Sequence, residues 1–494
     1  MVDLNFYTLS LTLLSLLFTL FFIRRLISRG GGTSPPSLPI IGNLHQLGHL
    51  PHRSLSNLSR KHGPLMLLHF GPKPVLVVSS ADVGNQILKS HDLAFSDKPL
   101  TRDLKKVFYN GNDLFNSPYG DRWRKLRRIT VHELLSRSRV KSFGSIREEE
   151  TSLLMRKIEE LSSASQPVNL TRMFAAFLND VIVRAALGKK YSGTEDGERF
   201  LEALEEGSRL LGSLRLGDFV PWLSCISCLN GRDAAIDRVV EKRDAFLDKV
   251  IQEHLRSSNA SKENIMSILV GIYKGDVPGV SIDFVFVKGV ILDIFAAGTE
   301  TTTTPLIWLM TELLRHPTVM KKLQDEIRGT MNGKHHITED ELLKMPYLRA
   351  VIKEIFCLHP PLPVFVRVTR DHINLMGYEV APKTMVVINA WAIGHDPSCW
   401  DEPEKFMPER FLNLSRDFKG LDFHLIPFGF GRRVCLGLGF ATAVVDHAVA
   451  NLMLKFDWAL PDGATREDLD VTERLGLTNA KDTPLVVFAS IRSD

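Results

Sequence analysis

The chain has 494 residues, of which 44% are hydrophobic and 24% charged, and 61 Lys and Arg against 57 Asp and Glu give a net charge of +4. This composition is ordinary for a folded globular protein and excludes a disordered chain, a fibrous repeat and a polytopic membrane protein. So small a charge gives no argument for nucleic-acid binding. Five cysteines in so long a chain form no disulfide scaffold, so we expect an informative cysteine to be a ligand or nucleophile.

The first predicted element is an apolar segment, Phe6–Ile23, whose 18 residues are at the low end of the length that spans a bilayer. Arg24, Arg25 and Arg29 follow it, and positive charge on that side places the rest of the chain in the cytosol. The alternative is a cleaved signal peptide, in which the basic region would precede the apolar run. We therefore predict an uncleaved membrane anchor and basic flank over residues 1–29.

A short hinge is predicted over residues 30–39. The glycines Gly30 to Gly32 give a flexible joint, and the prolines of Pro35–Pro39 fix an extended segment. Anchor and hinge together would hold a soluble body against a membrane. No later linker or repeat divides the chain, so residues 40–494 are predicted to form one domain.

Most of that domain has helical periodicity. Two β-rich runs, Leu65–Phe70 and Val75–Ser80, predict a hairpin around Gly71–Pro74. The longest predicted element is a helix over Ile282–Arg315, which ends before Pro317 and is long enough to cross the whole domain. Because it is apolar almost all round, we expect this helix to be buried.

Polar residues interrupt the long helix at Gly298–Thr304, and Pro305 follows them. Gly, Pro and a run of Thr are poor helix formers, so we expect local unwinding that leaves room for a ligand or water. A hydroxyl beside a carboxylate, here Thr301 beside Glu300, is a plausible proton-delivery pair. The alternative is a structural kink in which the Thr hydroxyls bond back to helix carbonyls.

A segment rich in Gly and Arg, Pro427–Gly437, leads into a second apolar helix over Leu438–Phe456. Cys435 stands at the start of this helix, where the dipole and the free N–H groups stabilise a thiolate. The segment has no His for a catalytic pair, and zinc would need further ligands. Cys225 and Cys228 lack a second pair and are better explained as part of an apolar loop. What remains is a metal that takes one thiolate, and haem is the known case.

Five residues meet the pattern F-x-x-G-x-R-x-C-x-G: Phe428, Gly431, Arg433, Cys435 and Gly437. This pattern resembles the haem-thiolate signature of the cytochrome P450 superfamily. Further motifs similar to that family occur in the expected order: Trp123-x-x-x-Arg127, Ala297–Thr302 and Pro408–Phe411. The hinge and His359–Pro363 are most similar to plant microsomal members. The resemblance implies a mainly α fold of the α+β type, with a helical haem-binding domain, small β-sheets and a single anchor helix in the endoplasmic reticulum membrane.

The resemblance also implies a role for each motif. Cys435 would be the axial thiolate of haem b, in a loop shaped by Phe428, Gly431 and Gly437. The haem propionates would be bound by Trp123, Arg127 and Arg433, with Arg367 as a further candidate. Thr301 and Glu300 would be the catalytic proton-delivery pair, and Glu354 and Arg410 would form a buried structural ion pair. Candidate walls of the substrate site, by the same resemblance, are Phe108–Phe115, Leu210–Leu216, Phe295–Thr299, Val364–Val368 and Leu475–Thr478.

The implied function is that of a membrane-anchored monooxygenase. It would insert one atom of O₂ into a small lipophilic substrate, with electrons from NADPH through NADPH-cytochrome P450 reductase. A basic face for docking this acidic partner would comprise Arg122, Arg124, Lys125, Arg128 and Arg432. The alternative for these charges is a solvated helix surface.

The chain departs from the family pattern at Cys357, where Glu354-x-x-Arg is expected. Losing one partner of a buried charge network typically costs ~3–5 kcal/mol. Leu436 replaces the usual Pro after the ligand Cys, and Val364–Arg367 lacks the expected Pro before Arg. Two alternatives therefore stay open: a haem enzyme of this fold that dehydrates or rearranges its substrate, for example an oxime, or a catalytically degenerate, non-enzymatic paralogue.

Overall fold

The computed structural model describes residues 12–19, 34–213, 215–220, 231–256, 264–277, 280–334, 337–461 and 464–492. Of the predicted anchor it describes only residues 12–19, which are helical and exposed. The rest of Phe6–Ile23, the arginines that follow it, and Cys225 and Cys228 lie outside the described residues. Within the described ranges, no helix is both long and apolar enough to cross a bilayer.

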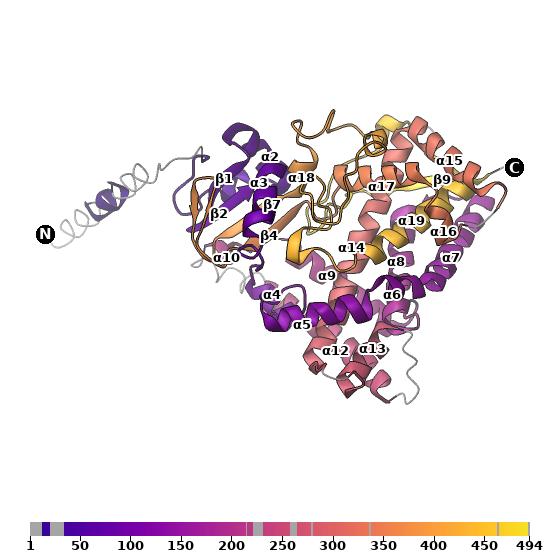
Figure 1. The fold of residues 1–494 in the computed structure, drawn as a ribbon, viewed down its shortest axis with the longest axis horizontal. Helices are drawn as coiled ribbons and strands as arrows, with labels where there is room; N and C mark the ends of the chain where they lie inside the picture. Colours follow the sequence, from indigo (N-terminus) through magenta and orange to yellow (C-terminus); the bar gives the residue numbers. More distant parts are fainter. Residues whose placement is uncertain are drawn as a thin grey trace.

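Helices make up most of the molecule, and the largest sheet lies at the end nearer the N-terminus (Figure 1). The helices of the first half are α2 (Pro51–His62), α3 (Ala81–Gln86), α4 (Arg102–Val107), α5 (Asp121–Ile129), α6 (Arg137–Ser142), α7 (Gly144–Ser163), α8 (Leu170–Leu187), α9 (Glu195–Gly212), α10 (Leu216–Phe219) and α12 (Arg232–Arg256). Those of the second half are α13 (Ile265–Lys274), α14 (Phe284–Arg315), α15 (Pro317–Met331), α16 (Glu339–Leu342), α17 (Pro346–Leu358), α18 (Ala390–Gly394) and α19 (Leu438–Lys455). Short 3₁₀ turns include η5 (Pro408–Phe411) and η6 (Gly431–Arg433).

The largest sheet has the strand order β1-β2-β7-β4. Its strands are β1 (Leu65–Phe70), β2 (Lys73–Val78), β7 (Met385–Asn389) and β4 (Val364–Val368). The smaller sheets comprise β3 (Val168–Asn169), β9 (Val486–Ile491) and β8 (Phe456–Ala459), and the hairpin of β5 (Ile373–Leu375) with β6 (Tyr378–Val380). The predicted hairpin is confirmed, because β1 and β2 pair antiparallel around Gly71, whose φ is +61°. Pro74, which has no N–H, precedes Val75, where pairing with β7 begins.

The predicted long helix is confirmed as α14, which runs through the core (Figure 1). It begins after Asp283, whose carboxylate accepts the N–H of Phe286 at 2.7 Å, and it ends where Pro317 opens α15. Every residue from Thr302 to Leu314 is buried. The burial predicted for the first half is only partly confirmed, because Val285, Ala296 and Ala297 are exposed.

The unwinding predicted at Pro305 is not found, because α14 is helical without a break from Phe284 to Arg315. Thr303 donates its hydroxyl to the Thr299 carbonyl at 2.9 Å, and the Thr301 hydroxyl donates to Ala297. These bonds follow the back-bonded alternative. Dense packing around a buried Pro305 offsets the one backbone bond that proline removes.

Candidate functional site

Cys435 lies between η6 and α19, and its backbone N–H donates to the Phe428 carbonyl at 2.9 Å. The side chain is accessible to solvent, yet burial raises the pKa of the thiol. These two facts together place the sulfur on the wall of an internal space. The backbone N–H groups of Gly437 and Leu438 and the charge of Arg127 act in the opposite direction and favour the thiolate.

The loop before Cys435 depends on glycine at two positions with positive φ. Gly429 has φ +76° and Gly431 has φ +57°. A Cβ on Gly431 would lie 2.1 Å from a carboxylate oxygen of Asp92, and the same carboxylate accepts the backbone N–H of Arg432 at 3.3 Å. The ring of Phe428 packs against the ring of Phe356 on α17, with the two centroids 5.0 Å apart, and so fixes the loop to that helix.

Arg433 and Arg367 bring buried positive charge to this loop. The guanidinium of Arg433 donates to the carbonyls of Ser96 at 2.7 Å and Ser117 at 2.5 Å. Burial lowers the pKa of Arg433 to about 10. Arg367, on β4, is 3% exposed; burial, and then the charge of Arg433, lowers its pKa to about 9. Its Nε has no hydrogen-bond partner among the described residues.

Trp123 and Arg127 come from α5, on the other side of Arg433. The Trp123 indole N–H donates to the Leu114 carbonyl at 3.1 Å, and Arg127 donates to the Val434 carbonyl at 3.1 Å. The guanidinium carbons of Arg433 and Arg127 lie 4.3 Å and 5.3 Å from the centre of the Trp123 ring. Trp123 therefore supports both cations through its ring face.

Lys98 joins this group, and the sequence interpretation missed it. Burial, followed by the charges of Arg367 and Arg433, lowers the pKa of its ammonium well below the usual value. A lone Lys before a Pro carries no pattern that marks a site. Lys98 joins the group through the fold, because Asp97 pairs with Val368 at the end of β4 and Arg433 of η6 donates to the Ser96 carbonyl.

The four cations, Lys98, Arg127, Arg367 and Arg433, have little negative charge to balance them. The nearest ion pair joins Arg433 to Asp97 at 4.0 Å, the limit of such a contact. Buried positive charge is costly unless it is paired, and a guanidinium fork suits a carboxylate. The residues therefore fit a group that brings carboxylates to the cations and a metal to the Cys435 thiolate, as a haem does.

Thr301 and Glu300 lie on α14 and point to different partners. Thr301 is half-buried, and its hydroxyl bonds to its own helix at the exposed residue Ala297. Glu300 accepts the Ser208 hydroxyl of α9 at 2.6 Å and the Thr478 hydroxyl at 2.7 Å. No hydrogen bond joins Thr301 to Glu300 in the described part of the chain.

Three of the candidate wall segments meet at Glu300. Gly212, at the end of α9, packs so closely on the C-terminal segment that an added Cβ would lie 2.6 Å from the Leu477 nitrogen. Arg474 reaches Oε1 of Glu300 at 3.4 Å, the same oxygen that accepts the Thr478 hydroxyl. The structure thus brings together Leu210–Leu216, Phe295–Thr299 and Leu475–Thr478, which are far apart in the sequence.

Glu354 and Arg410 form the predicted ion pair, with Glu354 Oε2 and Arg410 Nε 3.1 Å apart. The Met407 N–H donates to the other carboxylate oxygen at 2.7 Å. Burial raises the pKa of Glu354 to about 7, although the charge of Arg410 lowers it. Cys357 is buried in an apolar cluster with Ala350, Trp400, Phe411 and Leu425.

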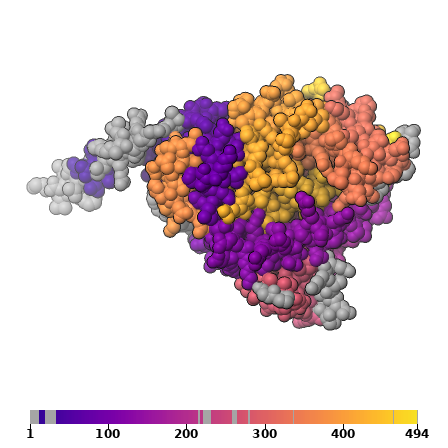
Figure 2. Space-filling view, in the orientation of Figure 1, coloured from indigo at the N-terminus to yellow at the C-terminus, as the bar shows by residue number. Residues whose placement is uncertain are grey.

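The predicted basic face lies mainly on α5, at the lower front of the molecule (Figure 2). Arg122 pairs with Asp283 at 3.1 Å and Arg432 with Asp92 at 3.1 Å, and Arg124 pairs with Asp121. Part of its positive charge is therefore neutralised within the chain.

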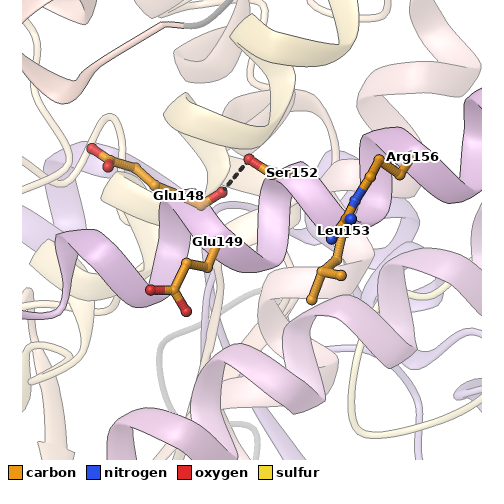
Figure 3. A pocket seen from close by; sticks show the side chains of 5 residues that line it. All are labelled: Glu148, Glu149, Ser152, Leu153 and Arg156. Carbon is orange, nitrogen blue, oxygen red and sulfur yellow. Dashed lines mark hydrogen bonds between the residues drawn. The ribbon is translucent and has the colours of Figure 1, made fainter.

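A separate hollow of about 400 Å³ is formed by side chains of α7 (Figure 3). Its lining residues are Glu148, Glu149, Ser152, Leu153 and Arg156. The Ser152 hydroxyl donates to the Glu148 carbonyl at 2.8 Å, within the helix. None of the predicted site residues belongs to it.

A family model described as Cytochrome P450 matches residues 33–486. Cytochrome P450 736A117 of Prunus mume is 53% identical over 465 residues, covering 92% of this chain and 89% of the relative. Tabersonine/lochnericine 19-hydroxylase of Catharanthus roseus is 47% identical over 466 residues, or 92% of each chain. Norfluorocurarine oxidase of Strychnos sp is 45% identical over 490 residues, or 96% of each chain. A zebra fish cytochrome P450 solved with progesterone is similar with a TM-score of 0.77 at 25% identity, covering 90% of this chain and 99% of that one.

Proposed function

Because this chain belongs to the cytochrome P450 family, we propose that it is a membrane-anchored monooxygenase of plant specialised metabolism, acting on a small lipophilic substrate. Members of this family are haem oxidoreductases that incorporate oxygen and take electrons from a redox partner, and this chain is one of them. The observation that carries the proposal is the Cys435 thiol beside four cations withdrawn from solvent, whose closest carboxylate contact among the described residues is that of Arg433 with Asp97 at 4.0 Å.

Cys435 would hold the haem iron, and Lys98, Arg127, Arg367 and Arg433 would hold the propionates. The N–H groups of Gly437 and Leu438 lower the pKa of the thiol and would moderate the negative charge of the thiolate. When bound, the haem supplies the activation of O₂. The protein contributes the orientation of that group and a water-poor site on one side of α14.

Thr301 would present a proton to the reacting centre. Thr301 is half-buried beside the exposed Ala297, and its hydroxyl need only turn away from the Ala297 carbonyl to donate elsewhere. Glu300 would return protons to this side from its contacts with Ser208 and Thr478. Glu300 and Thr301 would therefore act one after the other, because they bond to different partners and not to each other in this structure.

Small lipophilic substrates suit the aliphatic and Phe side chains of the wall segments. Two relatives are named as a norfluorocurarine oxidase and a tabersonine/lochnericine hydroxylase, which supports a small-molecule substrate of plant specialised metabolism.

Residues 1–29 would anchor the protein in the endoplasmic reticulum membrane, with the domain of residues 40–494 in the cytosol. The end of the hinge is fixed to this domain, because the Asn43 and Gln46 amides donate to the Pro36 carbonyl at 3.2 Å and 2.9 Å. NADPH-cytochrome P450 reductase would dock on the basic face of α5 and supply the electrons.

The reaction class is tested with full-length protein in membranes, together with a reductase and NADPH. We expect a red-shifted thiolate band in the reduced, carbon-monoxide-bound difference spectrum, and one labelled atom in the product under ¹⁸O₂. A dehydrated or rearranged product without label would support the alternative of a haem enzyme that does not incorporate oxygen into its substrate. Well-expressed protein without the thiolate band would support the degenerate paralogue.

A further inference from the structure

A carboxylate on α14 holds the segment Asp113–Ser117, which overlaps the end of the candidate wall Phe108–Phe115, against the helix. One oxygen of Asp293 accepts the backbone N–H groups of Leu114 at 2.9 Å and Phe115 at 3.2 Å. Gly289, one turn earlier on the same face, brings the chain closer still, because an added Cβ there would lie 3.1 Å from Asp113 Cα. The segment therefore lies directly on the helix backbone.

A second carboxyl group, that of Asp113, faces the first. Asp113 is fully buried, and one of its oxygens accepts the backbone N–H and the side-chain amide of Asn116, both at 2.8 Å. Each carboxyl group shifts the pKa of the other, so the two lie within interaction distance. The remaining oxygen of each is buried and has no hydrogen-bond partner among the described residues. A single proton between the two carboxyl groups would satisfy both of these oxygens, because a protonated carboxyl donates and a carboxylate accepts.

We propose that Asp113 and Asp293 share one proton, and that this pair is a positioning element for the oxygenation reaction. The carbonyls of the segment it fixes hold the side chains expected to bind the cofactor. Leu114 accepts the Trp123 indole, while Ser117 accepts Arg433 at 2.5 Å. The part of the inference that concerns the reaction rests on the proposed function; the shared proton does not.

The surroundings of the pair favour a single negative charge. Burial, followed by the charge of Asp113, raises the pKa of Asp293 well above its usual value, and burial also raises that of Asp113. The charged groups that face the pair are Lys98 and Arg433. Asn116 supplies the remaining polar contacts. Asp293 is the neutral half, because each carboxyl group accepts two N–H donors but the charge of Asp113 raises the pKa of Asp293 further.

The shared proton is tested by infrared spectroscopy of the full-length, haem-loaded protein in membranes. We expect a carboxylic-acid stretch at neutral pH that shifts in D₂O and is lost in Asp293→Asn. The matched control is Asp237→Asn, which removes an exposed carboxylate that pairs with Lys106 at 2.7 Å. A spectrum in which Asp293→Asn loses no carboxylic-acid band would overturn the proposal.

The positioning role is tested with two haem ligands of different size, imidazole and 4-phenylimidazole. Asp293→Asn keeps a donor toward Asp113 and an acceptor for Leu114 and Phe115, so binding of both probes should stay within about twofold of wild type. Asp293→Ala should weaken only the larger probe, by about tenfold, because only that probe reaches the wall. Equal affinities for both probes in the Asn and Ala variants would refute positioning. The infrared band is independent of turnover, so it stands even if no oxygenation is found.

Discussion

Two groups of buried charge in this protein differ in their balance. Around Cys435, four cations outnumber the negative charges that face them, which are those of Asp97, at 4.0 Å from Arg433, of Asp92 and of the Asp113–Asp293 pair. Under α17, Glu354 and Arg410 neutralise each other at 3.1 Å, although a cation expected beside them is replaced by Cys357. Unbalanced buried charge is costly to an empty protein, so it indicates a ligand that completes it. A balanced pair serves the fold alone.

The balanced pair is supported further by backbone atoms. Arg410 donates to the Asp401 carbonyl at 2.6 Å and the Lys405 carbonyl at 3.0 Å. Arg410 therefore holds the segment before η5 in place even without the third member of the family network. This argues against a fold that fails for want of an arginine at position 357.

The largest expected effect is at the thiolate itself. Cys435→Ala should abolish the red-shifted carbon-monoxide band, because no other thiol among the described residues belongs to this loop. Cys399→Ala is the matched control, since Cys399 is half-buried near Ser398 and Trp400 and should leave the band unchanged. If Cys435→Ala kept the band, Cys435 would not be the iron ligand, and the four cations around it could not be explained by a haem.

The comparison itself is tested by removing one cation from each group. Arg367→Leu should stabilise the haem-free protein by ~1–4 kcal/mol while weakening haem binding, because it deletes an unpaired buried charge. Arg410→Leu should destabilise the protein by ~3–5 kcal/mol whether or not haem is bound, because it leaves Glu354 unpaired. Denaturant unfolding of both forms measures the two effects. If both variants lost the same stability in the haem-free protein, the two groups of buried charge would not differ in their balance.

A smaller effect is expected from Cys357→Arg. Because the folded pKa of Glu354 is about 7, against an unfolded value near ~4.3, the folded state binds more protons between these values. Stability should therefore fall as the pH rises from about 4.3 to about 7, by at most about 4 kcal/mol. The arginine should lower the pKa of Glu354, flatten this slope and raise haem occupancy near neutral pH. Unfolding curves at a series of pH values decide it, and an unchanged slope would mean that Arg410 already suffices.

Local patterns in the sequence predicted the hairpin at Gly71, the span of α14 and the loop that carries Cys435. They failed where distant segments meet. Thr478 approaches Glu300 from 178 positions away, and Asp113 is 180 positions before Asp293. The signal available for Asp293 was its charge within Gly289–Ala297, a stretch that is otherwise apolar. Helix propensity also misjudged Pro305, because tertiary packing overrides a local preference of this size.

The smallest expected effect distinguishes Thr301, whose hydroxyl is proposed to deliver a proton, from Thr303, whose hydroxyl only bonds to the helix. Thr301 and Thr303 both donate back to the carbonyl four residues earlier, but Thr301 is half-buried whereas Thr303 is buried. Thr301→Ala should lower the fraction of NADPH oxidation that yields product by about tenfold, or about 1.4 kcal/mol in the competing barriers. Thr303→Ala removes the same helical bond and should leave that fraction unchanged. If both variants uncouple to the same extent, the effect belongs to the helix and not to proton delivery by Thr301.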